Sequence, residues 1–308
     1  MQLNIAKQKF KGSEKVMENN RQNSTNINWY PGHMAKTKRL ISEKINLIDV
    51  VYEVIDARIP YSSKIVDIDQ YIKDKPRILV MTKMDLCDKK ETNKWIAYYE
   101  KQGYYVVGID LMKENTNKII QLTKELMKEK NKKREAKGLQ SRRTRVLVVG
   151  VPNAGKSTLI NRLVGKKAVV TGNKPGVTKS LDWIRINNDI ELLDSPGILW
   201  PKFENQKVAY NLASFTAIKE EVLPLFDVIE YILKCLEKYY PEKLEDRYSL
   251  SKIDDDIVET LDMIGKKRGC LVRGGEIDYE KVYSLILGDI KEGLIKGLTF
   301  DRIEGNQL

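Results

Sequence analysis

The chain has 308 residues with 42% hydrophobic side chains, enough to bury the cores of about two globular domains. Its 54 Lys and Arg against 43 Asp and Glu leave a net charge of +11, which favours a polyanionic partner but also suits a merely soluble protein. Three scattered cysteines, and no apolar run near the ~18 residues of a membrane span, argue against a disulfide framework, a zinc site and a membrane partner, and favour a cytoplasmic location.

The first predicted features along the chain are a polar extension and a helix. Residues 1–26 lack the apolar core of a signal peptide, and we expect them to be disordered. From Met34 to Ile48, apolar side chains recur at intervals of seven, four and three residues, which is the spacing of one helix face. His33, the one histidine of the chain, lies at the start of this predicted helix.

An α/β domain is predicted next, followed by a helical one. Short apolar runs that end in polar clusters indicate buried strands at 50–55, 77–81, 104–107, 145–149 and 190–193. Helical patterns at 119–137 and from Lys156 alternate with these strands, which predicts a doubly wound α/β domain over residues 27–202. Amphipathic spacing from Leu225 to Leu236 and helical stretches around 206–219, 253–267 and 278–293 predict an all-α domain over residues 203–308.

A phosphate-binding loop is the strongest motif. Residues 150–157, GVPNAGKS, match GxxxxGK[ST] between an apolar strand and a helical pattern. In that geometry, backbone N–H groups hold the α/β-phosphates, Lys156 neutralises the β/γ-phosphates and the Ser157 hydroxyl binds Mg²⁺. The nucleotide-binding residues expected from this segment are Asn153, Ala154, Gly155, Lys156, Ser157 and Thr158.

Two further segments suit the γ-phosphate side of such a site. Asp194 follows the strand 190–193 in a DSPG sequence, where it can contact Mg²⁺ through water while the Gly197 N–H senses the γ-phosphate. Thr178, in the sequence PGVT, is the expected second protein ligand of Mg²⁺, and Thr171 is a less favoured rival.

The base is expected to be guanine. Thr82-Lys83-Met84-Asp85 follows the strand 77–81 and resembles the guanine-specificity motif [NT]KxD, in which the acid accepts hydrogen bonds from guanine N1–H and the 2-amino group. In isolation this tetrapeptide is more often an acidic turn at a helix start. Asp110 and Leu111, after the next strand, would form the loop that packs on the base.

The order of these motifs suggests a family. The base-reading loops precede the phosphate loop, the reverse of the Ras order. With WYPGHMAK at 29–36, DARIP at 56–60, KPGVTK at 174–179 and DSPGILWPKF at 194–203, the sequence resembles the YlqF family of circularly permuted GTPases over roughly residues 27–300. Two departures are Thr82, where the family usually has Asn, and Asp110-Leu111 in place of a small Ser-containing pair.

The resemblance implies a circularly permuted, Ras-like P-loop GTPase with Mg²⁺ that binds GTP and GDP. It implies that the enzyme acts in the cytoplasm, late in assembly of the large (50S) ribosomal subunit, with its helical domain on rRNA. No DNA partner is expected. Residues 113–145 hold twelve Lys and Arg against four Glu. The resemblance implies that this basic patch binds rRNA. The alternative is a solvated Lys-rich helix, which is the commoner meaning of such a run.

The water-activating group is a separate question. Ras-like enzymes place a glutamine after the DxxG glycine, but here that residue is Ile198. The family's proposed replacement is His33, whose ordinary pKa suits a neutral imidazole that accepts a proton from water. The alternative is that His33 contacts RNA or caps backbone. Resemblance to related GTPases also suggests that Asn153 helps to coordinate K⁺. The alternative is that Asn153 only stabilises the phosphate loop by hydrogen bonding.

Two other functions stay open on sequence alone. One is a nucleotide-binding RNA scaffold with negligible intrinsic hydrolysis, which Ile198 allows. The other is a P-loop NTPase with another base specificity, which would not require the TKMD sequence.

Overall fold

The computed structural model describes residues 32–139, 142–166, 183–195, 205–215, 217–218 and 223–304, with side chains described from Thr37 onward. Its strands are β1 (Val50–Asp56), β2 (Arg77–Thr82), β3 (Tyr105–Gly108), β4 (Thr144–Gly150), β5 (Trp183–Arg185) and β6 (Ile190–Asp194). The helices of the first part are α2 (Gly32–Lys44), the 3₁₀ turn η1 (Ile45–Leu47), α3 (Asp69–Ile72), α4 (Lys89–Lys101), α5 (Asn117–Glu135) and α6 (Lys156–Val164).

The six strands found in these residues form one sheet in the order β3-β2-β1-β4-β6-β5. All neighbours are parallel except β5, which runs antiparallel to β6 at the edge. The register pairs Asp56 with Thr82, Val54 with Gly150, and Val148 with Asp194. The carboxyl ends of β1, β2, β4 and β6 therefore meet at one edge, where parallel sheets bind ligands.

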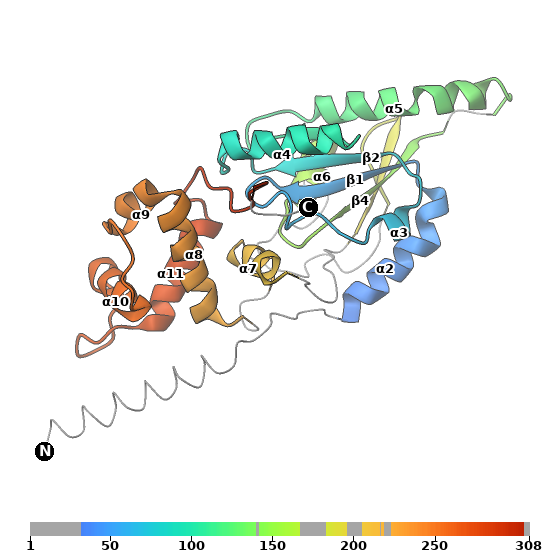
Figure 1. Cartoon of the computed structure of the whole chain (residues 1–308). Coiled ribbons are helices and arrows are strands. Elements are labelled where there is room, and N and C mark those ends of the chain that lie inside the picture. Colours follow the sequence, from blue (N-terminus) through green and yellow to red (C-terminus); the bar gives the residue numbers. More distant parts are fainter. Residues whose placement is uncertain are drawn as a thin grey trace, which may run out of the picture.

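Helices cover both faces of this sheet. Alternate residues of a strand point to opposite faces. On one face Ile55 and Met81 pack with Trp95 of α4. On the other, the Tyr52 hydroxyl lies 2.5 Å from the hydroxyl of Thr123 on α5. The doubly wound arrangement predicted from the strand and helix patterns is thus confirmed (Figure 1).

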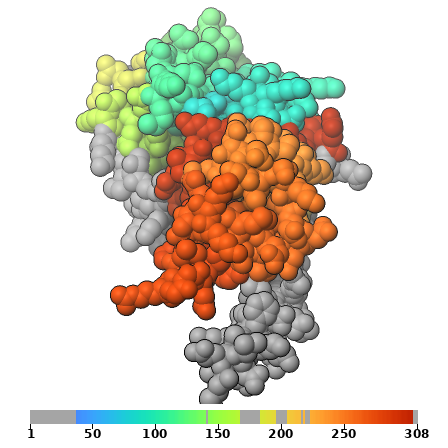
Figure 2. All heavy atoms as spheres, turned by 90° about the vertical axis from the view of Figure 1, so that its left-hand side faces the viewer, coloured from blue at the N-terminus to red at the C-terminus, as the bar shows by residue number. Residues whose placement is uncertain are grey.

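A helical domain follows the sheet. It comprises α7 (Gln206–Ser214), α8 (Leu225–Tyr239), α9 (Pro241–Tyr248), α10 (Ile257–Arg268) and α11 (Tyr279–Lys291). The predicted amphipathic face of α8 is buried from Val228 to Leu236. Figure 2 shows this domain, in orange and red, as a lobe below the blue-green α/β domain. No helix in the described ranges is long and apolar enough to cross a membrane.

The segment after α11 returns to the sheet domain. The carboxylate of Asp301 is fully buried and accepts hydrogen bonds from the backbone N–H of Tyr61 (2.8 Å) and of Ser62 (2.7 Å). It also accepts from the Ser62 hydroxyl and from the Asn211 amide of α7, both at 2.7 Å. One carboxylate therefore joins the first domain, α7 and the C-terminal segment.

Some elements were not predicted. The helix α4 is capped by Asp88, whose side chain accepts hydrogen bonds from the N–H groups of Lys90 and Glu91, and its buried face consists of Thr92, Trp95 and Tyr99. The antiparallel strand β5 is three residues long, too short for a periodic signal. The division at residues 202 and 203 stays a prediction, and residues 1–26 lie outside the described residues.

Candidate nucleotide-binding site

The phosphate loop lies between β4 and α6. Gly155 precedes α6 with φ +94°, a conformation that strains any residue with a Cβ. A glycine brings no capping side chain, so the N–H groups of the first turn, which includes Ser157 and Thr158, are left for an anion. Both side chains are half-buried. A Cβ on Gly150 would also meet the Val54 carbonyl oxygen at 2.3 Å, so β4 enters the loop through a residue that must be glycine.

Lys156 lies across this loop. Its Nζ donates to the carbonyl oxygens of Gly150 (3.0 Å) and Val151 (2.9 Å), and its side chain is buried. Burial lowers the pKa of Lys156 to about 8; Asp194 opposes this shift and the Lys83 ammonium adds to it. The site therefore holds a cation whose charge is poorly compensated, as suits the binding of phosphates.

Two oxygen donors suit a hard divalent cation. Ser157 is in the first turn of α6 and Asp194 is the last residue of β6, next to Val148 of β4. The Ser195 hydroxyl donates to the Val148 carbonyl (2.7 Å) and fixes the end of β6. Hydroxyl and carboxylate oxygens fit Mg²⁺, which takes its other ligands from phosphates and water. No cluster of three or more His, Cys, Asp or Glu that could hold a metal occurs in the described ranges.

The predicted base-reading segment is tied to the phosphate loop. The Thr82 hydroxyl donates to the Ala154 carbonyl at 2.6 Å, and it would lie 3.2 Å from a Cβ on Gly155. Lys83, in the left-handed region with φ 60°, donates to the Asn153 carbonyl at 2.8 Å. Thr82 and Lys83 thus connect the predicted base-reading segment to the phosphate loop.

The remaining base-side residues follow the same edge. Asp85 is exposed after β2, with its carboxylate available to a ligand. Asp110 and Leu111 follow β3 and are buried, and Met84 contacts Gly108, so the two loops pack together. The Asp110 carboxylate accepts from the Met112 N–H (2.8 Å), which shapes a turn. The structure therefore brings the base loops together.

One site residue was missed by the motif search. Asp56, the last residue of β1, is buried and accepts a hydrogen bond from Lys83 Nζ at 2.8 Å. Although burial raises it, the charges of Arg58 and Lys83 hold the pKa of Asp56 below its usual range. A polar residue at the carboxyl end of a buried strand was the available signal.

Other predicted residues cannot be placed at the site. His33 lies in the first turn of α2, but its side chain is outside the described residues. Thr178, its rival Thr171, Gly197 and Ile198 also lie outside them. Their roles remain predictions.

Comparison with known proteins decides the family. A family model described as "50S ribosome-binding GTPase" matches residues 145–270. The protein called ribosome biogenesis GTPase A of Priestia megaterium is 49% identical over 277 residues, which cover 89% of this chain and 96% of that protein. This chain belongs to the ribosome biogenesis GTPase A family. Its Bacillus cereus member is 48% identical over 279 residues, which cover 90% of this chain and 94% of that protein.

A solved structure supports the same assignment. The crystal structure of GNP-bound YlqF from T. maritima aligns with TM-score 0.64 and 26% identity, covering 87% of this chain and 98% of that one. The chain is a GTP hydrolase with a circularly permuted P-loop GTPase domain (here the G domain), and the family resemblance noted in the sequence is confirmed. The family uses Mg²⁺ with GTP, and Ser157 and Asp194 fit that ion.

The Thr82 hydrogen bond gives a first prediction for this GTPase. Thr82→Val keeps the side-chain volume and removes the donor to Ala154, so we expect GTP affinity to fall about threefold to tenfold, the effect of one net hydrogen bond. Thr123→Val is the control, because Thr123 is equally buried but belongs to α5. Equal GTP dissociation constants for wild type and Thr82→Val, measured by equilibrium titration, would contradict this role.

The lowered pKa of Lys156 gives a second prediction. Phosphates stabilise the ammonium, so bound Lys156 has a higher pKa than the value of about 8 in the free protein. At pH 7 the free side chain is already charged, whereas at pH 8.5 most of it is neutral and must take up a proton on binding. Calorimetry of GTP binding in two buffers should therefore show proton uptake that grows from pH 7 to pH 8.5. An unchanged proton count would contradict the shift.

Proposed function

We propose that this GTPase binds the precursor of the large (50S) ribosomal subunit and acts in the cytoplasm as a GTP-dependent switch in its late assembly. The observation that carries this proposal is the phosphate loop joined to a base-reading loop by Thr82 and Lys83, in a chain whose near-full-length relatives are named ribosome biogenesis GTPase A. The reaction is hydrolysis of GTP to GDP and phosphate.

Each residue has a defined part in the proposed reaction. The N–H groups of residues 153–158 and the Lys156 ammonium hold the phosphates, and Asp85 reads guanine. Ser157, Thr178 and, through water, Asp194 would hold Mg²⁺, which neutralises charge on the phosphates. The Gly197 N–H senses the γ-phosphate. Coordination of K⁺ by Asn153 is an additional hypothesis, and equal turnover in KCl and NaCl would exclude it.

His33 is proposed to orient and deprotonate the attacking water on the ribosomal particle. It would take the role of the glutamine that follows the DxxG glycine in Ras-like enzymes, because this chain has Ile198 at that position. The helix α2 that carries it packs against the core through the buried Ile41, and the turn η1 that follows it packs there through the buried Ile45. Lys38, in the middle of α2, forms an ion pair with Asp67, which holds the helix against the loop before α3.

His33→Ala tests both the residue and the function. We expect GTP affinity within twofold of wild type and a loss of at least about a hundredfold in particle-stimulated hydrolysis, the usual contribution of a general base. Single-turnover hydrolysis is measured with and without large-subunit precursors. Retained stimulation would exclude His33. No stimulation of the wild type would favour the RNA-scaffold function, and equal competition by ATP would favour another NTPase.

Two basic surfaces support binding to rRNA. In the helical domain, Lys266, Lys267 and Arg268 are exposed in the last turn of α10, and Arg273 is exposed in the turn that follows. Basic side chains in a terminal turn are well placed to contact RNA phosphates, which dominate such binding. Gly274 and Gly275 both have positive φ and shape the tip beside Arg273.

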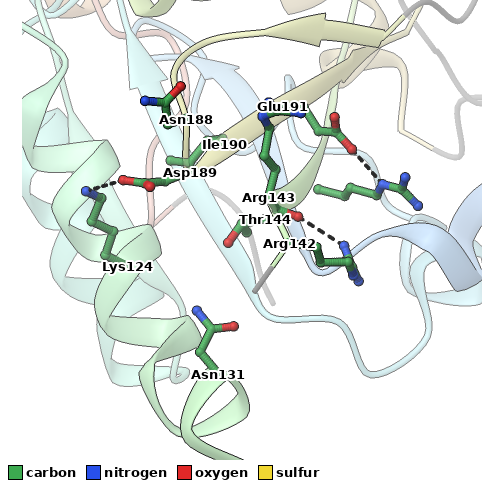
Figure 3. Close-up of a pocket in the computed structure, with 10 residues that line it drawn as sticks. Lys124, Asn131, Arg142, Arg143, Thr144, Asn188, Asp189, Ile190 and Glu191 are labelled. Carbon is green, nitrogen blue, oxygen red and sulfur yellow. Dashed lines mark hydrogen bonds and ion pairs between the residues drawn. The ribbon is translucent and has the colours of Figure 1, made fainter. Parts of the chain in front are cut away.

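The second surface belongs to the G domain, at the edge opposite the nucleotide. It is a pocket of about 630 Å³ between α5 and the amino ends of β4 and β6 (Figure 3). Its lining includes Lys124, Asn131, Arg142, Arg143, Thr144, Arg145, Asn188, Asp189, Ile190 and Glu191.

The charges of this pocket favour an anion. Lys124 pairs with Asp189 at 2.8 Å and Arg145 with Glu191 at 2.6 Å, at opposite sides of the pocket. Among the described residues Arg143 has no acidic partner, and its Nε is buried without a hydrogen bond. A phosphate of the RNA backbone would supply that acceptor, while a merely solvated basic helix would not need the pocket.

Arg143→Gln tests the pocket. We expect weaker binding of the large-subunit precursor and a slope of log affinity against log salt that is smaller by about one, because one phosphate contact is lost. GTP affinity should not change, since the pocket lies at the opposite edge of the sheet. Lys94→Gln, an exposed cation of α4 paired with Glu91, is the control. An unchanged salt slope for Arg143→Gln would exclude this surface.

A further inference from the structure

Arg58 is a buried arginine between the two domains, outside the nucleotide motifs. Its side chain is only 2% exposed. Its Nε donates to Asp56 Oδ1 at 3.0 Å and its Nη2 donates to Asp56 Oδ2 at 2.9 Å, a bidentate pair. The backbone N–H of Arg58 also donates to Asp56 Oδ1, at 3.0 Å. Arg58 therefore determines how the Asp56 carboxylate is oriented.

The other side of the guanidinium belongs to the helical domain. Nη1 donates to the carbonyl oxygen of Ile290, in the last turn of α11, at 3.0 Å. The guanidinium carbon lies 4.4 Å from the centre of the Phe215 ring, directly after α7. Cations are favoured at helix C-termini and over aromatic faces, so both contacts hold Arg58 in place.

Asp56 passes this position on to the nucleotide loops. Its Oδ2 also accepts from Lys83 Nζ at 2.8 Å, and the same Nζ donates to the Asn153 carbonyl of the phosphate loop at 2.8 Å. A continuous series of charged hydrogen bonds thus runs from α11 through Arg58, Asp56 and Lys83 to the phosphate loop. Charge-assisted bonds between buried groups are strong and restrict their geometry.

We propose that Arg58 is a positioning residue for nucleotide binding, through which the contacts of Ile290 and Phe215 with its guanidinium tune the affinity of the site. The physical reason is competition for one carboxylate. If Arg58 withdraws, both oxygens of Asp56 are left to Lys83, whose ammonium is then drawn away from the Asn153 carbonyl. Burial lowers the pKa of Lys83 and Asp56 opposes this shift, which fits an ammonium that depends on that carboxylate.

The coupling works in both directions. A partner that moves α11 changes the affinity of the nucleotide loops. Nucleotide binding must in turn shift the position of α11 by the same coupling free energy. The proposal concerns the purified chain and needs no ribosomal partner. The role of Arg58 can therefore be disproved while the assembly function stands, and the assembly function can be disproved while the role of Arg58 stands.

A double-mutant cycle tests the proposal. Arg58→Lys keeps a positive charge beside Asp56 but cannot make the bidentate pair, the Ile290 bond and the Phe215 stack together. We expect it to weaken GDP and GTP binding about tenfold, a coupling typical of contacting buried groups. In a Lys83→Met background, Asp56 still binds Arg58. There we expect Arg58→Lys to weaken nucleotide binding less than twofold, because Arg58 acts through Lys83.

The control is Asn211→Ala, which breaks another buried contact between the domains, to Asp301 and Ser62, that does not reach Lys83. We expect its nucleotide affinity within twofold of wild type, although its thermal unfolding temperature should fall. Dissociation constants are measured with a fluorescent GDP on the full chain well below each unfolding temperature.

The outcomes separate positioning from general destabilisation. Equal losses from Arg58→Lys in both backgrounds, or no loss in a folded Arg58→Lys protein, would overturn the proposal. If Arg58→Lys fails to fold, Phe215→Leu replaces it, because it removes the stacked ring and leaves all of the hydrogen bonds. That variant should lose about threefold in affinity, and only when Lys83 is present.

Discussion

The nucleotide site depends on two hydrogen bonds between loops that are distant in sequence, from Thr82 to Ala154 and from Lys83 to Asn153. They are possible because parallel strands deliver their carboxyl ends to one edge of the sheet, whatever order the chain visits them in. Gly155 lets the phosphate loop approach Thr82 closely. These two bonds hold the phosphate-binding loop and the base-reading loop in fixed positions relative to each other.

This dependence explains how a permuted order of motifs keeps a GTPase site. The strand order β3-β2-β1-β4-β6-β5 fixes which ends are neighbours, while the connections decide what else each end contacts. Here β1 ends in Asp56, which lies between Lys83 and Arg58. The end of β1 is therefore linked through Lys83 to the phosphate loop and through Arg58 to the helical domain.

Much of the site could be predicted because its signals are local. The phosphate loop and the base-reading segment with Asp85 follow from residues a few positions apart and from the strands before them. The role of Asp56 and Arg58 could not, because it requires Lys83 and Ile290, which are 27 and 232 residues away from their partners. The pocket around Arg143 was missed for the same reason, since α5 and two strand ends contribute to it. For His33 the sequence gives a residue type and no distance.

Asp301 has a consequence for the order of events during synthesis. Its carboxylate completes the contact between residues 61–62 and α7, and both partners leave the ribosome before it does. Before Asp301 emerges, the amides of Tyr61 and Ser62 lack their native acceptor and can donate only to water or to a non-native group. This contact between the two domains can therefore form only after the chain has been translated through α11 and the segment beyond.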